Sequence, residues 1–198
     1  MRKIVAMARV TLDGVIQGPG GPDEDRSGGF DLGGWGWQFS DDEKKGVAAL
    51  VGMVGSSDKP NDLLLGRRTY DNFASYWPHG PAESPFTAAF NKANKYVLTH
   101  SDQKQGNQKL DWANSHKLGS VDELKKLKAG EGPDIVLWGS STLYPPLLEA
   151  NLIDSIHLLI CPIILGQRQK AVWECRPSRH HEAGEQRSDK IRSHYREV

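Results

Sequence analysis

The chain has 198 residues, with 25 acidic and 25 basic side chains and therefore no formal net charge. This length is enough for one domain with a sizeable core, and the charge balance indicates neither a nucleic-acid nor a membrane partner. Two cysteines are too few for a disulfide framework or a metal cluster. No apolar stretch approaches the roughly 18 residues of a membrane span. Because the N-terminus leads directly into a strand-like pattern, we expect a cytoplasmic protein.

The first predicted strand covers residues 3–12, which are mostly β-branched or otherwise apolar, as in a central strand buried on both faces. Ala6 and Ala8 are small residues on one face of this strand, and they leave room for a flat group to approach. An Asp-Gly turn begins at Asp13, and the sequence is apolar again through Ile16.

Residues 17–39 are rich in glycine, and this stretch is longer than a plain connector. Its aromatic residues Trp35, Trp37 and Phe39 have two interpretations. They belong either to a loop that closes over a flat ligand or to a loop that covers the domain's own core.

A helix is predicted to begin after Ser40, because acidic residues fill the first turn and apolar residues follow at helical spacing up to Val54. Two interpretations of Asp41 and Asp42 stay open. Their carboxylates either stabilise the positive end of the helix dipole or contact a substrate.

The stretch from residue 62 to 73 reads Asp-Leu-Leu-Leu-Gly-Arg-Arg-Thr-Tyr-Asp-Asn-Phe. Its leucines predict a buried strand that ends at Gly66, and helical spacing starts at Thr69. A strand that turns into a helix presents free N–H groups and a positive dipole end to an anion. Arg67 and Arg68 add planar guanidinium groups suited to phosphate. We predict a phosphate-binding turn here; the alternative is an ordinary helix start with two solvated arginines.

A second strand–turn–helix follows later in the chain. Residues 135–138 predict a buried strand, and residues 143–151 predict a helix. The small residues between them let a pyrophosphate approach the backbone. These four residues are Gly139, Ser140, Ser141 and Thr142.

The remaining segments give weaker signals. We predict strands over residues 95–99 and 155–165, a helix over residues 121–129, and only weak strand character over residues 110–118. Cys161 lies in an apolar run and is interpreted as a small core residue. The polar residues at the end of the first of these strands, where open α/β sheets bind ligands, are Thr99, His100 and Ser101.

Three of these motifs carry a family resemblance. Leu-Gly-Arg-Arg-Thr-Tyr, which starts at Leu65, resembles the Gly-Arg-(Lys/Arg/His)-Thr-(Trp/Tyr) signature of dihydrofolate reductase and its relatives. Ala-x-Ala-x-x-x-x-Asp-Gly-Val-Ile from Ala6 resembles the family's opening strand, and Val-Leu-Trp-Gly-Ser-Ser-Thr-Leu from Val136 resembles its second nucleotide turn. The small bacterial proteins related to the reductase domain of riboflavin biosynthesis, a bifunctional deaminase-reductase C-terminal domain, are the relatives that this chain most resembles.

The alternation of strands and helices predicts an α/β domain. The resemblance implies a three-layer α/β/α sandwich with a mostly parallel sheet over residues 1–166. It further implies an NADPH-dependent oxidoreductase that transfers a hydride to a C=N or C=O group of a pterin-like or aminopyrimidine substrate. The alternative is a nucleotide-binding protein of this fold without turnover. A second copy of the chain is a candidate partner, and no metal is expected.

The resemblance also implies roles for individual residues. Arg67 and Arg68 would bind phosphates, including the 2′-phosphate of NADPH, and Thr69 would hold the pyrophosphate. The proton donor would be Asp13, Asp41, Asp42 or a water molecule. The expected cofactor contacts are Ala6, Ala8 and Ile16 around the nicotinamide, and Gly66, Arg67, Arg68, Thr69, Thr99, His100, Ser101, Gly139, Ser140, Ser141 and Thr142 along the rest of the cofactor.

Residues 167–198 form an atypical polar tail. They hold eight basic and five acidic residues and few aliphatic ones, so no strand is predicted. If the codons from Gly166 are read one base later, the encoded sequence can be x-Asn-Gly-Lys-Lys-Leu-Phe-Gly. This resembles the Gly-x-Gly-(Lys/Arg)-x-Leu-Phe that the family would show here. Our hypothesis is a frameshift at or just after Leu165; the alternative is a natural polar tail, and the nucleotide sequence of the gene decides between them.

Overall fold

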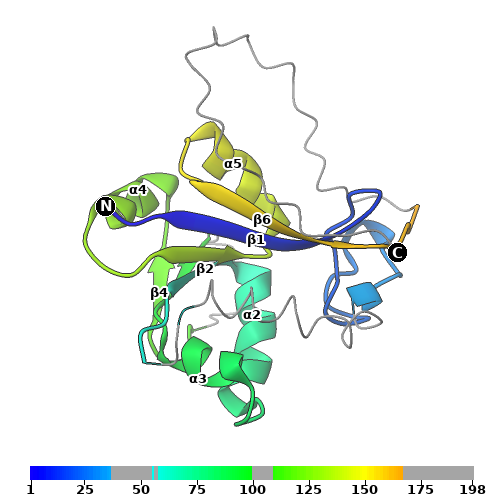
Figure 1. Ribbon diagram of the computed structural model, residues 1–198, viewed down its shortest axis with the longest axis horizontal. Helices are drawn as coiled ribbons and strands as arrows, with labels where there is room; N and C mark the ends of the chain where they lie inside the picture. The colour runs from blue at the N-terminus through cyan, green and yellow to red at the C-terminus, as the bar shows by residue number, and fades with distance from the viewer. Residues whose placement is uncertain (37–54, 56–57, 100–108, 167–198) are drawn as a thin grey trace, which may run out of the picture.

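The computed structural model describes residues 1–36, 55, 58–99 and 109–166. Within these residues, six strands form one sheet in the order β4-β3-β2-β5-β1-β6. All five neighbouring pairs are parallel, which confirms the predicted α/β sheet (Figure 1). The strands are β1 (Ile4–Thr11), β2 (Asp62–Gly66), β3 (Lys95–Leu98), β4 (Ser115–Leu118), β5 (Ile135–Trp138) and β6 (Ser155–Cys161).

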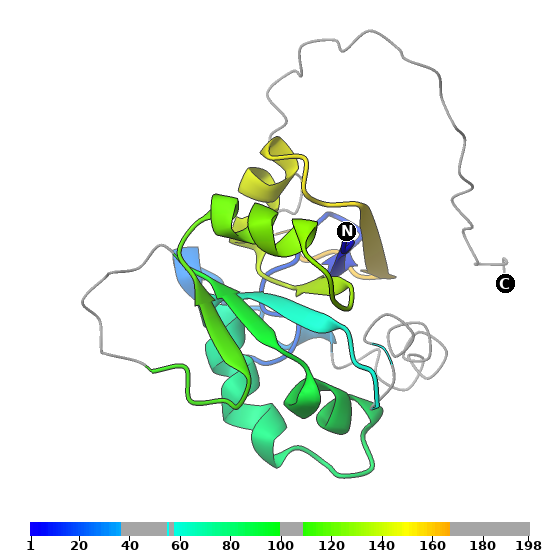
Figure 2. The same ribbon diagram turned by 90° about the vertical axis from the view of Figure 1, so that its left-hand side faces the viewer.

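Helices cover both faces of the sheet, as a parallel sheet requires. Figure 2 shows α2 and α3 on one side of the strands and α4 and α5 on the other. The predicted three-layer sandwich is therefore confirmed. The helices are α2 (Arg67–Tyr76), α3 (Pro85–Lys92), α4 (Val121–Ala129) and α5 (Tyr144–Glu149), with short 3₁₀ turns η1 (Ser27–Gly29), η3 (Trp77–His79) and η4 (Ser141–Leu143).

The two faces of the sheet have separate apolar cores. Leu64 of β2 packs on the side of α4 and α5, whereas Leu63 and Leu65 pack on the side of α2 and α3. This alternation follows from the two-residue period of a strand. All three leucines are fully buried, so β2 is a central strand, as its continuous apolar sequence predicts.

The chain leaves β2 and β5 in opposite directions. From β2 it passes through α2 and α3 to β3, and from β5 it passes through α5 to β6 at the other end of the sheet. β2 and β5 are neighbours. Open α/β sheets bind ligands in the crevice where the connections to neighbouring strands diverge in this way. The fold therefore marks the carboxyl ends of β2 and β5 as the place for a site.

Several element boundaries differ from those predicted. Helix α2 begins at Arg67 and not at Thr69, because Gly66, with φ −75° and ψ 162°, is the extended residue that precedes it. The second helix is confined to α5, since residues 141–143 form η4. The strand predicted over residues 155–165 ends at Cys161.

Trp35 covers part of the domain's own core, which is one of its two predicted roles. The side chain is buried and packs with Val15, Phe30 and Cys161. Its Nε1–H donates a hydrogen bond of 2.8 Å to the carbonyl oxygen of Gln17. Cys161 is buried in this same cluster, as predicted.

Several predicted features lie outside the described residues. They are Trp37, Phe39, the helix after Ser40 with Asp41 and Asp42, His100, Ser101 and the polar tail. Among the described residues, no helix is long and apolar enough to cross a lipid bilayer.

Candidate functional site

The two predicted phosphate turns meet in the structure. The backbone N–H of Gly66 donates a hydrogen bond of 2.8 Å to Ser140 Oγ. The same oxygen lies 2.9 Å from Thr69 Oγ1 and 3.1 Å from the carbonyl oxygen of Trp138. One hydroxyl thus connects the end of β2, the first turn of α2 and the end of β5.

The close contact between the turns depends on Gly66. A Cβ atom added at this residue would lie 3.3 Å from the Cβ of Ser140 and 3.2 Å from its Oγ. Such distances are tighter than ordinary van der Waals contact. The glycine of the Leu-Gly-Arg-Arg-Thr-Tyr motif therefore favours the close approach of the two turns.

The turn after β5 has an unusual backbone. Gly139 and Ser140 both have φ 57°, in the left-handed region. A serine in this region costs roughly 1–2 kcal/mol, so the hydrogen bonds of its hydroxyl help to hold the conformation. Turns that contain left-handed residues often form concave nests of N–H groups that bind anions.

Arg67 is held by its own helix. Its Nε lies 3.0 Å from both carboxylate oxygens of Asp71, and its Nη2 lies 2.9 Å from Oδ1. The guanidinium also lies over the Tyr70 ring, 5.8 Å from the ring centre. The side chain is half-buried and fixed close to the N-terminal end of α2.

Arg68 points to a different partner. Its Nη1 forms an ion pair of 2.5 Å with Asp25 and lies 3.3 Å from Ser27 Oγ. Burial alone would raise the pKa of Asp25, but hydrogen bonds from Ser27 and the neighbouring Arg68 lower it overall. Arg68 therefore connects α2 to the loop between β1 and residue 36. Both arginines have carboxylate partners, although the Arg68 side chain is 59% exposed.

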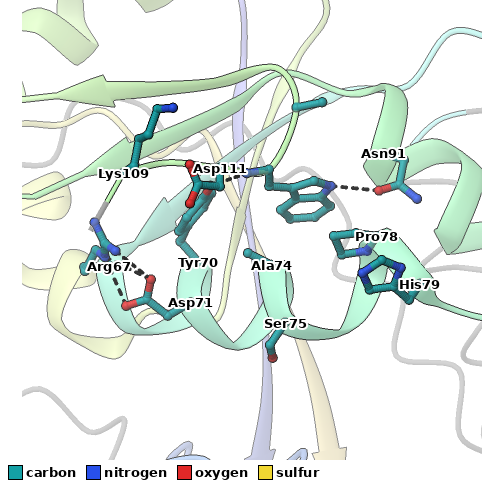
Figure 3. A pocket seen from close by; sticks show the side chains of 12 residues that line it. Arg67, Tyr70, Asp71, Ala74, Ser75, Pro78, His79, Asn91, Lys109 and Asp111 are labelled. Carbon is teal, nitrogen blue, oxygen red and sulfur yellow. Dashed lines mark hydrogen bonds and ion pairs between the residues drawn. The ribbon is translucent and has the colours of Figure 1, made fainter. Parts of the chain in front are cut away.

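An open hollow of about 890 Å³ lies along α2 (Figure 3). At one end it carries two cationic side chains, Arg67 and Lys109, together with the carboxylates of Asp71 and Asp111. Trp112 forms part of its wall. The hollow is lined by Arg67, Tyr70, Asp71, Ala74, Ser75, Pro78, His79, Asn91, Lys109, Asp111, Trp112 and Ala113.

Two hydrogen bonds, one from its backbone and one from its indole ring, hold Trp112 in this wall. Its backbone N–H donates a hydrogen bond of 3.0 Å to the hydroxyl of Tyr70, and its Nε1–H donates one of 2.7 Å to Asn91 Oδ1. Lys95 Nζ lies 4.4 Å from the centre of its ring. Sequence reasoning did not find this hollow. The four-residue spacing of Arg67 and Asp71 on a helix indicates an ion pair between them. The position of Trp112, in contrast, depends on tertiary contacts.

The other predicted contact residues vary in exposure. Ala6 and Ala8 are packed in the core beneath α4 and α5 and do not line the hollow. Ile16 and Thr99 are half-buried, and Thr142 is exposed in η4. Roles for these residues as cofactor contacts stay predictions.

Asp13 has structural contacts that were not predicted. Its carboxylate accepts hydrogen bonds from Thr11 Oγ1 at 2.6 Å and from the backbone N–H groups of Leu165 and Gly166. The bond from Thr11, followed by that from Gly166, lowers the pKa of Asp13. An ionised carboxylate has no proton to donate, so these contacts do not favour Asp13 as the proton donor, although that role stays untested.

Two solved structures are similar to this chain. A protein of Shewanella sp. PV-4 that is named for riboflavin biosynthesis matches with a TM-score of 0.51 and 21% identity, over 85% of this chain and 82% of that one. A dihydrofolate reductase from Enterococcus faecalis, complexed with NADP(H) and RAB-propyl, matches with a TM-score of 0.49 and 17% identity, over 85% and 75% of the two chains.

The sequence itself is similar to known proteins. It is 26% identical over 169 residues to the uncharacterised protein YyaP of Bacillus subtilis (strain 168), which covers 84% of this chain and 78% of the relative. A family model described as the RibD C-terminal domain matches residues 2–183. The match spans most of the chain, including the motifs around Gly66 and Gly139, so the chain belongs to the RibD C-terminal domain family, a reductase family with the dihydrofolate-reductase-like fold.

Proposed function

We propose that the protein is an NADPH-dependent reductase that transfers a hydride to a C=N or C=O group of a pterin-like or aminopyrimidine substrate in the cytoplasm. The observation that carries this proposal is the contact between Ser140 and the Gly66–Thr69 turn, at the carboxyl ends of β2 and β5. The two predicted phosphate turns meet there, and turns of this kind can present backbone N–H groups to an anion such as a pyrophosphate.

The residues present fit the pyrophosphate of such a cofactor. Gly139 has no side chain and a left-handed backbone, and its Cα lies beside Thr69, where an added Cβ would be 3.7 Å from Thr69 Oγ1. Helix α2 directs its positive dipole end to the same place. In this proposal, Thr69 and the backbone of residues 139–141 hold the pyrophosphate.

The hollow along α2 suits the end of the cofactor that carries the 2′-phosphate. Arg67 lies near the N-terminal end of α2 and lines the hollow together with Lys109. An arginine and a lysine are the usual partners of a phosphate monoester. We assign the 2′-phosphate, which distinguishes NADPH from NADH, to Arg67 and Lys109. Arg68 binds it only if it leaves Asp25.

Hydride transfer requires positioning more than side-chain chemistry. When bound, the nicotinamide supplies the hydride, and the protein holds it against the substrate and limits access of water. In this proposal the proton that completes the reduction comes from a water molecule, Asp13, Asp41 or Asp42; the lowered pKa of Asp13 disfavours it as the donor.

The test is a titration of the full chain with NADPH and with NADH, followed by tryptophan fluorescence; the sequence has six tryptophans. Saturable binding with NADPH preferred supports the proposal. Arg67→Ala should weaken NADPH binding at least tenfold more than NADH binding, because a lost charged hydrogen bond to phosphate costs about 1.5–3 kcal/mol. Equal weakening of both cofactors contradicts the assignment of the 2′-phosphate.

Turnover is measured separately. NADPH oxidation is followed at a fixed protein concentration with a panel of pterins and aminopyrimidines. Oxidation that depends on one of these substrates supports the reductase. Binding of NADPH without oxidation by any member of the panel indicates instead a nucleotide-binding protein without turnover on these substrates.

A further inference from the structure

Lys95 is a buried cation that the proposed mechanism does not use. Its side chain has no exposed surface, and its Nζ donates hydrogen bonds of 2.9 Å and 3.1 Å to the carbonyl oxygens of Phe90 and Asn91. Burial lowers the pKa of Lys95 to about 8, so the fold favours the neutral amine over the charged ammonium. Groups with a strongly shifted pKa are frequent at functional sites, and the contacts of this ammonium indicate what its charge does.

The ammonium of Lys95 lies against the ring of Trp112. Its Nζ is 4.4 Å from the ring centre, and a cation–π interaction of this kind is strongest away from water. Trp112 is 5% exposed, so the contact is shielded from solvent. A neutral amine still donates to the two carbonyl oxygens, but it lacks the charge that attracts the ring. The contact with Trp112 therefore depends on the protonation of Lys95.

Trp112 belongs to the part of the hollow's wall that carries Lys109. Residues 109–114 form neither a helix nor a strand, so side-chain contacts determine where this segment lies. The ring of Trp112 provides two of these contacts, one with Lys95 and one with Asn91 Oδ1. A weaker hold on the ring therefore leaves Lys109 less firmly placed.

Arg67 is connected to the same tryptophan through Tyr70. The Tyr70 hydroxyl accepts the backbone N–H of Trp112 at 3.0 Å, and the centres of the two rings are 6.3 Å apart. The guanidinium of Arg67 lies over the Tyr70 ring. Arg67 and Lys109 lie at the same end of the hollow (Figure 3), so one aromatic residue supports both cations that are assigned to the 2′-phosphate.

We propose that Lys95 is a positioning residue for the cofactor, whose charge holds Trp112 in the wall of the hollow. Through Trp112 it sets the positions of Arg67 and Lys109. This inference rests on the proposed function, and it adds that NADPH binding depends on the protonation of a residue that does not touch the cofactor. Binding should be tight while Lys95 is charged and should weaken as the pH rises through about 8.

Among the described residues, two elements bring charged or titratable groups toward this contact. β2 contributes Asp62, whose charge acts to raise the pKa of Lys95 and whose carboxylate is paired with Arg2. α2 contributes the hydroxyl of Tyr70. α3 contributes carbonyl oxygens, and β4 contributes Ser115, the register partner of Lys95. The ligand keeps its charge above neutral pH, because the second pKa of a phosphate monoester is about 6.

Calorimetric titration of the full chain with NADPH and with NADH, at about pH 7.5 and about pH 9, tests the proposal. For the wild type, NADPH binding should weaken about three- to tenfold at the higher pH, because part of a desolvated cation–π interaction is lost. NADH binding should change by less than about twofold. Lys95→Met should bind NADPH weakly at both pH values. Wild-type binding that does not depend on pH, or an equal change in Lys95→Met, overturns the proposal.

Lys92→Met is the matched control for the loss of a lysine. Lys92 also belongs to α3, but its Nζ donates to the carbonyl oxygen of Asp58 and it does not line the hollow. This variant should keep the wild-type change in NADPH binding between the two pH values. If it loses that change, the effect does not come from the contact between Lys95 and Trp112, and the proposal is wrong.

Trp112→Leu separates positioning from direct attraction. The variant keeps the lysine and loses the ring, so NADPH binding should be weak at both pH values. A pH dependence that survives in this variant would mean that the charge of Lys95 acts on the phosphate directly. The positioning role would then be wrong.

NMR of the wild type without cofactor tests the contact itself and does not require a variant of Lys95 to fold. The ring signals of Trp112, identified by their absence in Trp112→Leu, should shift with a midpoint at about pH 8. The possible failures differ. A chain that binds neither cofactor contradicts the proposed function and this inference with it. A chain that binds NADPH but has a Trp112 ring that does not titrate contradicts the role of Lys95 alone.

Discussion

The hydroxyl of Ser140 lies 2.9 Å from the hydroxyl of Thr69, although the two residues are 71 positions apart in the sequence. This contact brings the turn after β5 against the first turn of α2. Because Ser140 Oγ also accepts the N–H of Gly66, a small change at one residue is expected to affect both turns. The contact therefore provides a direct way to test how the candidate site is held together.

Removal of the Ser140 hydroxyl should destabilise the protein in a way that depends on the replacement. Ser140→Ala loses the hydrogen bonds and keeps a Cβ in the left-handed region, so we expect a loss of about 1–3 kcal/mol. Ser140→Gly loses the same bonds but adopts φ 57° without strain, and should be more stable than the alanine variant by about 1 kcal/mol. Urea denaturation measures both. A glycine variant no more stable than the alanine variant would show that the backbone there is unstrained.

Asp71 should oppose phosphate binding by Arg67. Its carboxylate contacts the Nε and Nη2 atoms of this arginine, and a second anion at the same guanidinium is repelled. Asp71→Asn should therefore tighten NADPH binding about two- to fivefold, which is the size of effect expected for a surface ion pair. The change in NADH binding should be smaller. Asp122→Asn on α4 removes the same charge far from the hollow. If it tightens NADPH binding equally, the effect is one of net charge and not of the Arg67 contact.

The ion pair between Arg68 and Asp25 should hold the loop between β1 and residue 36 on α2. Arg26, the neighbour of Asp25, has a side chain that is 64% exposed and is a tryptic cleavage site. Arg68→Met should increase the rate of cleavage after Arg26 several-fold, because the loop loses its contact with α2. Arg67→Met is the control, since its carboxylate partner belongs to α2 itself. Equal acceleration by both variants would indicate a general loss of helix stability.

The parts of the fold that were predictable have local causes. Helix α4 has the predicted bounds because Ser120 accepts a hydrogen bond from the N–H of Glu123 and so caps the first turn. Strand β5 has the predicted bounds because its four consecutive apolar residues, three of them buried, lie between two helical layers. The Gly-Arg-Arg-Thr turn was also predictable, since a glycine between an apolar run and residues at helical spacing indicates the end of a strand and the start of a helix.

The parts that were predicted only weakly, or were missed, depend on distant residues. Strand β4 contains exposed His116 and Lys117, and its strand conformation comes from pairing with β3. The partner of Arg68 was not predictable because Asp25 lies 43 positions earlier, in a glycine-rich loop without periodicity. The hollow beside Trp112 was missed for the same reason, since Tyr70 and Asn91 position that residue from two different helices.

Lys95 should make stability depend on pH. The side chain is fully buried, and burial lowers the pKa of Lys95 to about 8, although the charge of Asp62 acts to raise it. Between about pH 8 and the usual lysine pKa near 10.4, the unfolded chain binds more protons than the folded one, so the free energy of unfolding rises with pH. From pH 7.5 to 9.5 this rise should be about 2 kcal/mol.

Lys95→Met provides the reference for this measurement. The variant loses the hydrogen bonds from Nζ to the carbonyl oxygens of Phe90 and Asn91, so it should be less stable, but it should lack the rise between pH 7.5 and 9.5. Urea denaturation at the two pH values gives the difference. The buried hydroxyl of Tyr144, whose pKa burial raises, affects both proteins equally and acts at higher pH. Identical pH dependence in the two proteins would contradict the lowered pKa of Lys95.

The buried ion pair between Arg2 and Asp62 should be the most sensitive charged contact of those described. Both side chains are 3% exposed, and Asp62 also accepts hydrogen bonds from the backbone and side chain of Asn94. Asp62→Asn leaves the Arg2 charge buried without a carboxylate, which typically costs about 3–5 kcal/mol. Denaturation of the variant at neutral pH measures the loss.

An exposed ion pair gives the control for this prediction. Asp23 and Arg26 are paired with side chains that are 75% and 64% exposed, so Asp23→Asn should change stability by less than about 1 kcal/mol. The double variant Arg2→Met, Asp62→Leu removes both buried charges and should recover part of the loss. It should not recover all of it, because the N–H groups of Asn94 then lack their acceptor. A double variant less stable than Asp62→Asn would show that the cost comes from packing and not from the unpaired charge.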